Sequence, residues 1–184
     1  MTDPVDLKIV IAGAMGVGKT TAIAAVSETP PVSTEVRNND TAAHEKAFTT
    51  VAMDYGELRS PDGNRLRLYG VPGQTRFSFM WPMIERGALG VMLLADDSRE
   101  QAFEELVPFL KAFAYSIGAG RAVLGVGHLA GADAQVVDRY VARLSAMQIA
   151  IPVFTVDVRR RNDVLLLIDA LFTQVETAEE DIHP

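Results

Sequence analysis

The chain has 184 residues, of which 48% are hydrophobic and 22% are charged. This length favours a single domain with one sizeable core, since domains most often run about 100–150 residues. The net charge of −7 argues against nucleic acid as a main partner, because binding to a phosphate backbone needs clustered Lys and Arg. The absence of cysteine excludes a disulfide scaffold, and no uninterrupted apolar run reaches the ~18 residues that a membrane span needs.

The two ends of the chain carry little structural signal. Residues 1–6 have neither a basic region nor an apolar signal core, so we expect a flexible start and a cytoplasmic protein. Residues 177–184 are acidic and are predicted to form a flexible tail. The single domain is therefore expected to span residues 7–176.

The most specific motif lies at residues 13–20, which we call the phosphate loop. It reads Gly-Ala-Met-Gly-Val-Gly-Lys-Thr and is a complete GxxxxGK[ST] sequence. An apolar run at 7–12 predicts a buried strand before it, and residues 20–26 predict a helix after it. In such a setting successive backbone N–H groups and the helix N-terminus face the phosphates of a nucleoside triphosphate.

The roles of the loop residues follow from this geometry. Lys19 is expected to lie along the β- and γ-phosphates, with the Thr20 hydroxyl on Mg²⁺. The predicted phosphate-binding residues of this segment are Gly13, Ala14, Met15, Gly16, Val17, Gly18, Lys19, Thr20 and Thr21.

Strands and helices are predicted to alternate along the rest of the chain. The further β-rich runs are 48–58, 65–69, 89–95, 122–126 and 152–156. The helical patterns are 101–117, 134–147 and 163–176. This alternation predicts an α/β domain with a mainly parallel six-stranded sheet and helices on both faces.

Two connections stand out between these elements. The turn-rich segment 59–64 predicts a β-hairpin, and hence one antiparallel edge strand. Residues 29–47 are polar and have no clear period, which makes them long for a passive connection. We therefore expect this stretch to be a functional loop.

The order of phosphate loop, long loop, hairpin and Val71-Pro72-Gly73-Gln74 resembles the Ras-like small GTPases. The phrases at 49–56, 68–77 and 94–99 resemble more narrowly their bacterial branch, the MglA-like and actinobacterial conservon GTPases. The resemblance covers residues from about 7 to 172. It implies the three-layer fold of the P-loop NTPases, Mg²⁺ and GTP or GDP as ligands, and two switch segments at about residues 30–50 and 70–86 that signal to a partner.

The resemblance also implies the metal and catalytic residues. Thr50 is expected to bind Mg²⁺ and to sense the γ-phosphate, with Thr49 as the neighbour that a shifted register would select. Most Ras-like proteins have an aspartate where this chain has Gly70. In the MglA-like branch the aspartate of the neighbouring strand is thought to take its place, and Asp54 matches it.

Gln74 follows Gly73 directly, and the resemblance gives it the task of orienting the attacking water. The predicted catalytic set is therefore Gln74, Lys19 and Thr50, and Gly73 joins the phosphate-binding residues. MglA-like proteins also supply an internal arginine five residues before the strand aspartate, where this chain has Thr49. Arg37 and Arg76 remain candidates for such a cation, and slow intrinsic hydrolysis is expected.

The base-side motif departs from the family pattern. Guanine selectivity normally rests on Asn-Lys-x-Asp after the fifth strand, but this chain has Gly127-His128-Leu129-Ala130. Asp133 could reach the base only from a remodelled loop, or could instead cap the next helix. The candidate base-binding residues are His128, Leu129, Asp133 and Asp157.

Three functions are consistent with this pattern. The first is a slow GTPase switch. The second is a nucleotide-binding pseudo-GTPase or interaction module, with altered base specificity for ATP or for no nucleotide. The third, a small-molecule kinase, is disfavoured because the chain lacks an Arg-rich lid.

The segment after Gln74 is rich in large apolar residues, which either pack inward or form a partner surface. The resemblance suggests a Roadblock/LC7-type dimer as the partner. The surface is expected at Phe77, Phe79, Met80 and Trp81, and Met83 and Ile84 extend the apolar segment.

Overall fold

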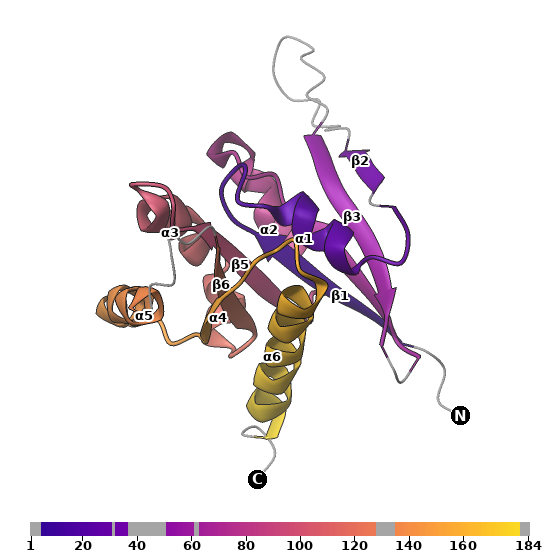
Figure 1. The fold of residues 1–184 in the computed structure, drawn as a ribbon. Helices are drawn as coiled ribbons and strands as arrows, with labels where there is room; N and C mark the ends of the chain where they lie inside the picture. Colours follow the sequence, from indigo (N-terminus) through magenta and orange to yellow (C-terminus); the bar gives the residue numbers. More distant parts are fainter. Residues whose placement is uncertain (1–4, 31, 37–50, 61–62, 128–134, 181–184) are drawn as a thin grey trace.

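The computed structural model describes residues 5–30, 32–36, 51–60, 63–127 and 135–180. They contain one seven-stranded sheet in the order β2-β3-β4-β1-β5-β6-β7, with helices on both faces (Figure 1). The strands are β1 (Asp6–Ala12), β2 (Val32–Val36), β3 (Val51–Arg59), β4 (Arg65–Gly70), β5 (Gly90–Asp96), β6 (Ala122–Gly127) and β7 (Val153–Thr155).

The predicted fold class is confirmed. Strands β4, β1, β5, β6 and β7 pair in parallel, whereas β3 runs antiparallel to both of its neighbours. All six predicted strands are present, and β2 adds a seventh inside the stretch 29–47 that we expected to be a loop. Because β2 pairs with β3 from Val32↔Tyr55 to Val36↔Val51, the antiparallel strand lies one place in from the edge. This pairing gives partners to the outer backbone groups of β3.

The helices follow the predicted order with three differences. They are α1 (Lys19–Val26), α2 (Trp81–Glu85), α3 (Ala102–Ala112), α4 (Ala114–Gly118), α5 (Val136–Ala146) and α6 (Arg161–Glu180), with a 3₁₀ turn η1 (Thr75–Met80) before α2. One difference is that η1 and α2 were not predicted. The predicted helix 101–117 is broken between α3 and α4, because Phe113 leaves helical geometry at ψ 23°. Helix α6 continues past the expected boundary at residue 176, and the Thr177 hydroxyl donates to the Thr173 carbonyl within it.

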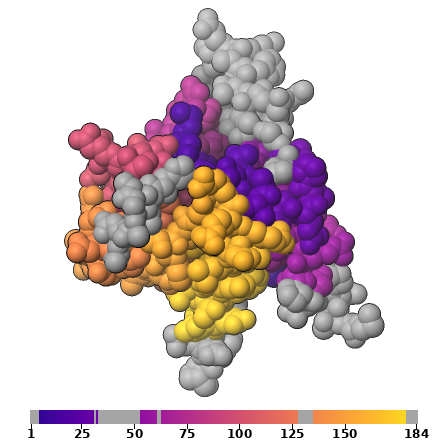
Figure 2. Space-filling model, viewed as in Figure 1, coloured from indigo at the N-terminus to yellow at the C-terminus, as the bar shows by residue number. Residues whose placement is uncertain are grey.

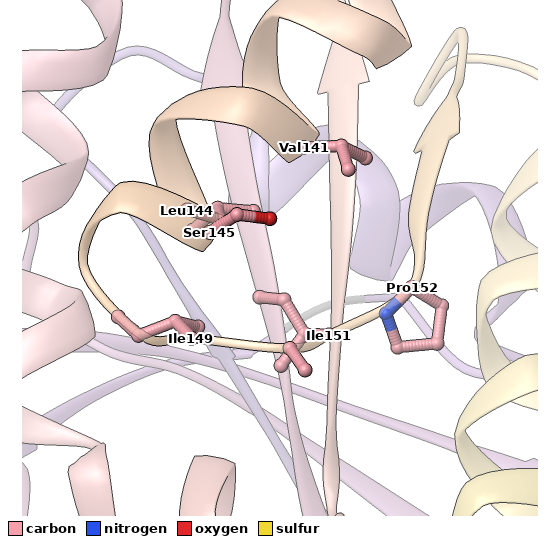
Figure 3. A pocket seen from close by; sticks show the side chains of 7 residues that line it. Val141, Leu144, Ser145, Ile149, Ile151 and Pro152 are labelled. Carbon is pink, nitrogen blue, oxygen red and sulfur yellow. The ribbon is translucent and has the colours of Figure 1, made fainter.

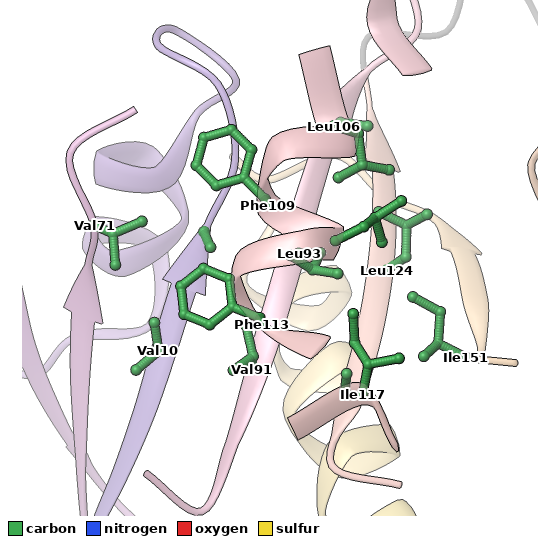
Figure 4. Close-up of a cluster of buried hydrophobic side chains, with 14 of the residues drawn as sticks. Val10, Val71, Val91, Leu93, Leu106, Phe109, Phe113, Ile117, Leu124 and Ile151 are labelled. Atoms are coloured by element: carbon green, nitrogen blue, oxygen red, sulfur yellow. The ribbon is translucent and has the colours of Figure 1, made fainter. Parts of the chain in front are cut away.

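Two apolar clusters, one on each face of the sheet, form the core. Ile9 and Ile11 of β1 point to the face covered by α1 and α6, whereas Val10 and Ala12 point to the face of α3 and α5. Figure 4 shows the second cluster, in which Phe109 and Phe113 lie over Val10 and Val91. In the space-filling view, α6 and α1 cover adjacent parts of the visible surface (Figure 2). Among the described residues, no helix is long and apolar enough to cross a membrane.

The expectation that Met80 and Trp81 belong to a partner surface is wrong. They are 5% and 1% exposed, because both belong to the apolar cluster on the face of the sheet that α3 and α5 cover. The Trp81 ring stacks on Phe109 at a centroid distance of 4.3 Å, and its Nε1 donates to the Pro72 carbonyl at 3.0 Å. Phe79, in contrast, is 53% exposed.

We predict that Trp81→Ala lowers the free energy of unfolding by about 3–5 kcal/mol, because it leaves a cavity beside α3. The matched change Phe79→Ala should alter it by no more than about 0.5 kcal/mol. Urea denaturation followed by circular dichroism measures both. Equal losses in the two variants would contradict the assignment of Trp81 to the core.

Candidate functional site

The phosphate loop connects β1 to α1 at the carboxyl end of the parallel strands, where open α/β sheets bind their ligands. Its glycines adopt backbone conformations and close approaches that residues with a Cβ rarely tolerate. Gly16 and Gly18 have φ of 82° and 99°, and a Cβ on Gly13 would lie 2.4 Å from the Leu94 carbonyl oxygen. The loop can therefore close tightly over the end of β1 and lead directly into α1.

A pocket of about 310 Å³ lies over this loop. Its walls come from the loop and α1, from β3, and from the segment that follows β4. The lining residues are Met15, Gly16, Gly18, Lys19, Thr20, Thr21, Asp54, Val71, Pro72 and Gly73. Segments that are far apart in the sequence thus bring most of the predicted phosphate and metal residues together.

Lys19 is held at the base of the pocket. Its Nζ donates to the carbonyls of Gly13 and Ala14 at 2.9 and 2.8 Å. The side chain is only 8% exposed, and this burial lowers its pKa to about 8, against the opposing effect of the nearby Asp54 charge. The positive charge of Arg99 lowers the pKa further.

Thr20 and Asp54 form the candidate metal site. The Thr20 hydroxyl donates to Asp54 Oδ2 at 2.5 Å, which joins the start of α1 to β3. Gly70 pairs with Asp54 across the sheet, and a Cβ there would lie 3.1 Å from Asp54 Cβ and 3.3 Å from Oδ2. Glycine at 70 therefore leaves space for the Asp54 carboxylate.

These two oxygen donors suit Mg²⁺, which usually keeps water and phosphate oxygens among its ligands. Across the described parts of the chain, no cluster of three or more His, Asp or Glu side chains is arranged to hold a metal. A cation held by Thr20 and Asp54 would therefore take its remaining ligands from water or phosphate oxygens, or from residues outside the described parts.

Gly73 packs directly against the phosphate loop. A Cβ at this position would lie 2.5 Å from the Met15 nitrogen and 2.8 Å from Lys19 Nζ. Any side chain at 73 would collide with the loop backbone. The next residue, Gln74, is half-buried, and its Nε2 lies 3.4 Å from Met15 Sδ. The structure thus places Gln74 at the edge of the loop.

Several predicted residues lie outside the described parts of the chain. They are Arg37, Thr49, Thr50, His128, Leu129, Ala130 and Asp133. Asp157 is described, and its carboxylate accepts hydrogen bonds from Arg159 Nε and a terminal nitrogen at 2.8 and 2.7 Å. These bonds lower the pKa of Asp157 to about 2. The adjacent Val158 reaches the loop, because a Cβ on Gly18 would lie 2.7 Å from its Cγ2.

Arg99 lies at the site although no motif in the sequence indicated it. This arginine lies between β5 and α3, and its guanidinium donates to the Met15 carbonyl at 2.8 Å. The one available signal was its position just after the carboxyl end of a predicted strand, at the same sheet edge as the phosphate loop. An isolated arginine in a turn has no periodicity that would indicate this contact.

A second hollow, of about 360 Å³, lies between α5 and β7 (Figure 3). Val141, Leu144, Ile149 and Pro152 line it, and Ser145 is the polar residue among its lining side chains. It lies at the amino end of β7, the opposite edge of the sheet from the phosphate loop. Although it is larger than the loop pocket, its lining contains no cation or glycine-rich backbone for a phosphate.

The lowered pKa of Lys19 predicts a pH-dependent stability. In the unfolded chain this amine keeps its proton up to about pH 10.4, so between pH 8 and 10 the unfolded state binds more protons and stability rises with pH. We expect Lys19 to contribute a rise of about 2 kcal/mol over this range. Urea denaturation at each pH should show this rise in the wild type and in the exposed-site control Lys111→Met, but not in Lys19→Met. The same slope in all three proteins would refute the prediction.

No protein-family model matches the chain. The chain is 34% identical over 107 residues to the Ras-related protein Rab-18 of Lymnaea stagnalis, which covers 56% of this chain and 47% of that protein. It is 26% identical over 147 residues to the Ras-related protein Rab-13 of Canis lupus familiaris, covering 78% of this chain and 64% of that protein. An uncharacterized protein of Methanocaldococcus jannaschii is 29% identical over 108 residues, which are 58% of this chain and 62% of that protein.

The matched region thus spans about half the length of the Rab-18 relative and under two thirds of the other two. The similarities are distant, but two of the three proteins are Ras-related, and the phosphate loop and the sheet order point in the same direction. Together these findings support a Ras-like P-loop GTPase.

Proposed function

We propose that the chain is a small GTP-binding switch that binds Mg²⁺ with GTP or GDP and hydrolyses GTP slowly. One observation carries this proposal: a single pocket gathers the phosphate loop, the Thr20–Asp54 pair and the backbone that leads to Gln74. Phosphate, metal and water would therefore meet in one place, as hydrolysis at a γ-phosphate requires.

Each part of the pocket has a role in this proposal. The loop N–H groups and Lys19 bind the phosphates, and Thr20 with Asp54 holds the metal, directly or through water. Bound Mg²⁺ would neutralise phosphate charge. We further propose that Thr50 completes the metal site from the first switch and that Gln74 orients the attacking water.

The packing of Gly73 supports a switch mechanism. A Cβ on Gly73 would lie 2.8 Å from Lys19 Nζ, so this segment lies beside the amine that would bind a γ-phosphate. We propose that a γ-phosphate bound there displaces the segment 72–74. Pro72 accepts the Trp81 hydrogen bond, so this movement acts on the buried ring of Trp81. Loss of the γ-phosphate would allow the segment to return.

Within this superfamily we propose the MglA-like branch. The support is the space that Gly70 leaves for Asp54, because this pair matches the metal arrangement that the resemblance implies. We also propose a Roadblock/LC7-type dimer as the partner. Its contact surface would be the exposed Phe79 and Met83 with the half-buried Phe77, since aromatic residues and Met are enriched at interfaces.

A second candidate is a nucleotide-binding module with altered base specificity and little hydrolysis. Two observations favour it. Gly127 stands where the guanine-selective motif begins, and a Cβ there would already lie 3.2 Å from the Val156 carbonyl oxygen. The Asp157 carboxylate is engaged by Arg159. Gly127 has no side-chain acceptor, and both oxygens of Asp157 already accept hydrogen bonds from Arg159. Neither residue therefore presents a free carboxylate to the N–H donors of guanine.

The nucleotide that co-purifies with the chain separates the two candidates. Chromatography of the denatured protein identifies it, and titration with GTP, GDP and ATP gives the affinities. GDP and a preference for guanine nucleotides would support the switch. ADP and a preference for ATP would support the second candidate, whereas no binding of any of the three nucleotides would contradict both.

We predict that Gln74→Leu abolishes single-turnover GTP hydrolysis and changes GTP affinity by less than about threefold. Leucine keeps the size of the side chain but cannot orient water. Thr75→Val, in the exposed position beside it, is the control and should hydrolyse GTP like the wild type. Normal hydrolysis by Gln74→Leu would remove Gln74 from the catalytic set.

A further inference from the structure

The guanidinium of Arg99 packs against the middle of the phosphate loop. One of its terminal nitrogens donates to the Met15 carbonyl at 2.8 Å. A Cβ on Gly16 would lie 2.8 Å from the same nitrogen, so glycine at 16 leaves this place to the guanidinium. A permanent positive charge therefore lies beside the backbone that would hold the phosphates.

Two carboxylates fix Arg99 in this position. Its Nε donates to Asp96 Oδ2 at 3.2 Å, and its other terminal nitrogen donates to Glu105 Oε2 at 2.8 Å. Asp96 is itself 6% exposed, and its Oδ1 accepts hydrogen bonds from the nitrogen and hydroxyl of Ser98. The long side chain is thus held with its charge directed at the loop, rather than left free in solvent.

We propose that Arg99 is a catalytic residue of the hydrolysis proposed above, supplied by this chain itself. With a triphosphate on the loop, its terminal nitrogen exchanges the Met15 carbonyl for a terminal phosphate oxygen, a stronger acceptor. The bond from water oxygen to the γ-phosphorus forms as the bond to the bridging oxygen breaks. The electron pair leaves with the nucleoside diphosphate, and the proton of the water passes to the released phosphate. The guanidinium neutralises charge on the transferring group.

Arg76 and Arg139 are less suited to this task. The guanidinium of Arg76 lies 4.8 Å from the Phe77 ring centroid at an exposed position. Arg139 forms an ion pair with Asp97 at 2.8 Å. Among the arginines that the structure describes, Arg99 is the one whose guanidinium donates a hydrogen bond to the loop backbone. Asp96 and Glu105 offset part of the positive charge of Arg99. The rate increase that Arg99 contributes would therefore be modest, in keeping with slow hydrolysis.

This inference rests on the proposed function, so the test measures binding and chemistry separately. The full-length chain is loaded with GTP, Mg²⁺ is added, and single-turnover hydrolysis is followed for the wild type, Arg99→Ala, Arg99→Lys and the control Arg139→Ala. Affinities for GDP and GTP are measured on the same proteins, and circular dichroism confirms that each is folded.

We expect Arg99→Ala to hydrolyse bound GTP about a hundredfold more slowly, with GDP affinity within about threefold of the wild type. Arg99→Lys should also be slow, because an ammonium lacks the planar fork that spans Asp96, Glu105 and a phosphate. Guanidinium chloride at a non-denaturing millimolar concentration should restore part of the rate in Arg99→Ala. Arg139→Ala should hydrolyse at the wild-type rate.

Two results would overturn the assignment of Arg99. One is wild-type hydrolysis by Arg99→Ala. The other is an equal loss of GDP and GTP affinity with unchanged hydrolysis of bound GTP, which would make Arg99 only a structural link. If Arg99→Ala does not fold, wild-type hydrolysis by Arg99→Lys is the overturning result. A wild-type chain that does not bind or hydrolyse GTP refutes the proposed function itself, and this inference with it.

Discussion

The close packing of Gly73 on the phosphate loop is the constraint on which the rest of the site depends. It brings the backbone after β4 onto the residues that would hold a phosphate, at a distance that admits no side chain. The preceding Pro72 carbonyl accepts the hydrogen bond of Trp81, and Trp81 stacks on Phe109 of α3. Packed and hydrogen-bonded groups therefore link the loop to the core, and in the proposed function they would couple the bound nucleotide to the position of Trp81.

Helix α3 is linked to the phosphate loop by a second chain of contacts. Glu105 on this helix binds Arg99, and Arg99 binds the Met15 carbonyl. The route through Phe109 and Trp81 is apolar, whereas this one is ionic. In the proposed mechanism a terminal phosphate acts on both, because it displaces Gly73 and competes with Met15 for the guanidinium. Helix α3, and not only the two proposed switch segments, would therefore be sensitive to the bound nucleotide.

The sequence predicted the phosphate loop and the order of strands and helices, because the loop is a contiguous motif and the long elements have clear periods. The meeting of Thr20 with Asp54 needs strands β3, β4 and β1 side by side, and only the family resemblance indicated it. Trp81 was misassigned because it lies where the short η1 turn passes into the five-residue helix α2, and such short segments show no period. The contact of Arg99 with Met15 joins residues far apart in the sequence, so it leaves no local pattern.

The most direct test of this account is the fluorescence of Trp81, the single tryptophan of the chain. Its emission is recorded as the nucleotide-free protein is titrated with Mg²⁺ and either GDP or a non-hydrolysable GTP analogue. If a γ-phosphate displaces Gly73 and Pro72, the analogue shifts the emission maximum or intensity and GDP has a clearly smaller effect. Saturable binding of both ligands with identical emission would contradict the proposed link between the phosphate loop and Trp81.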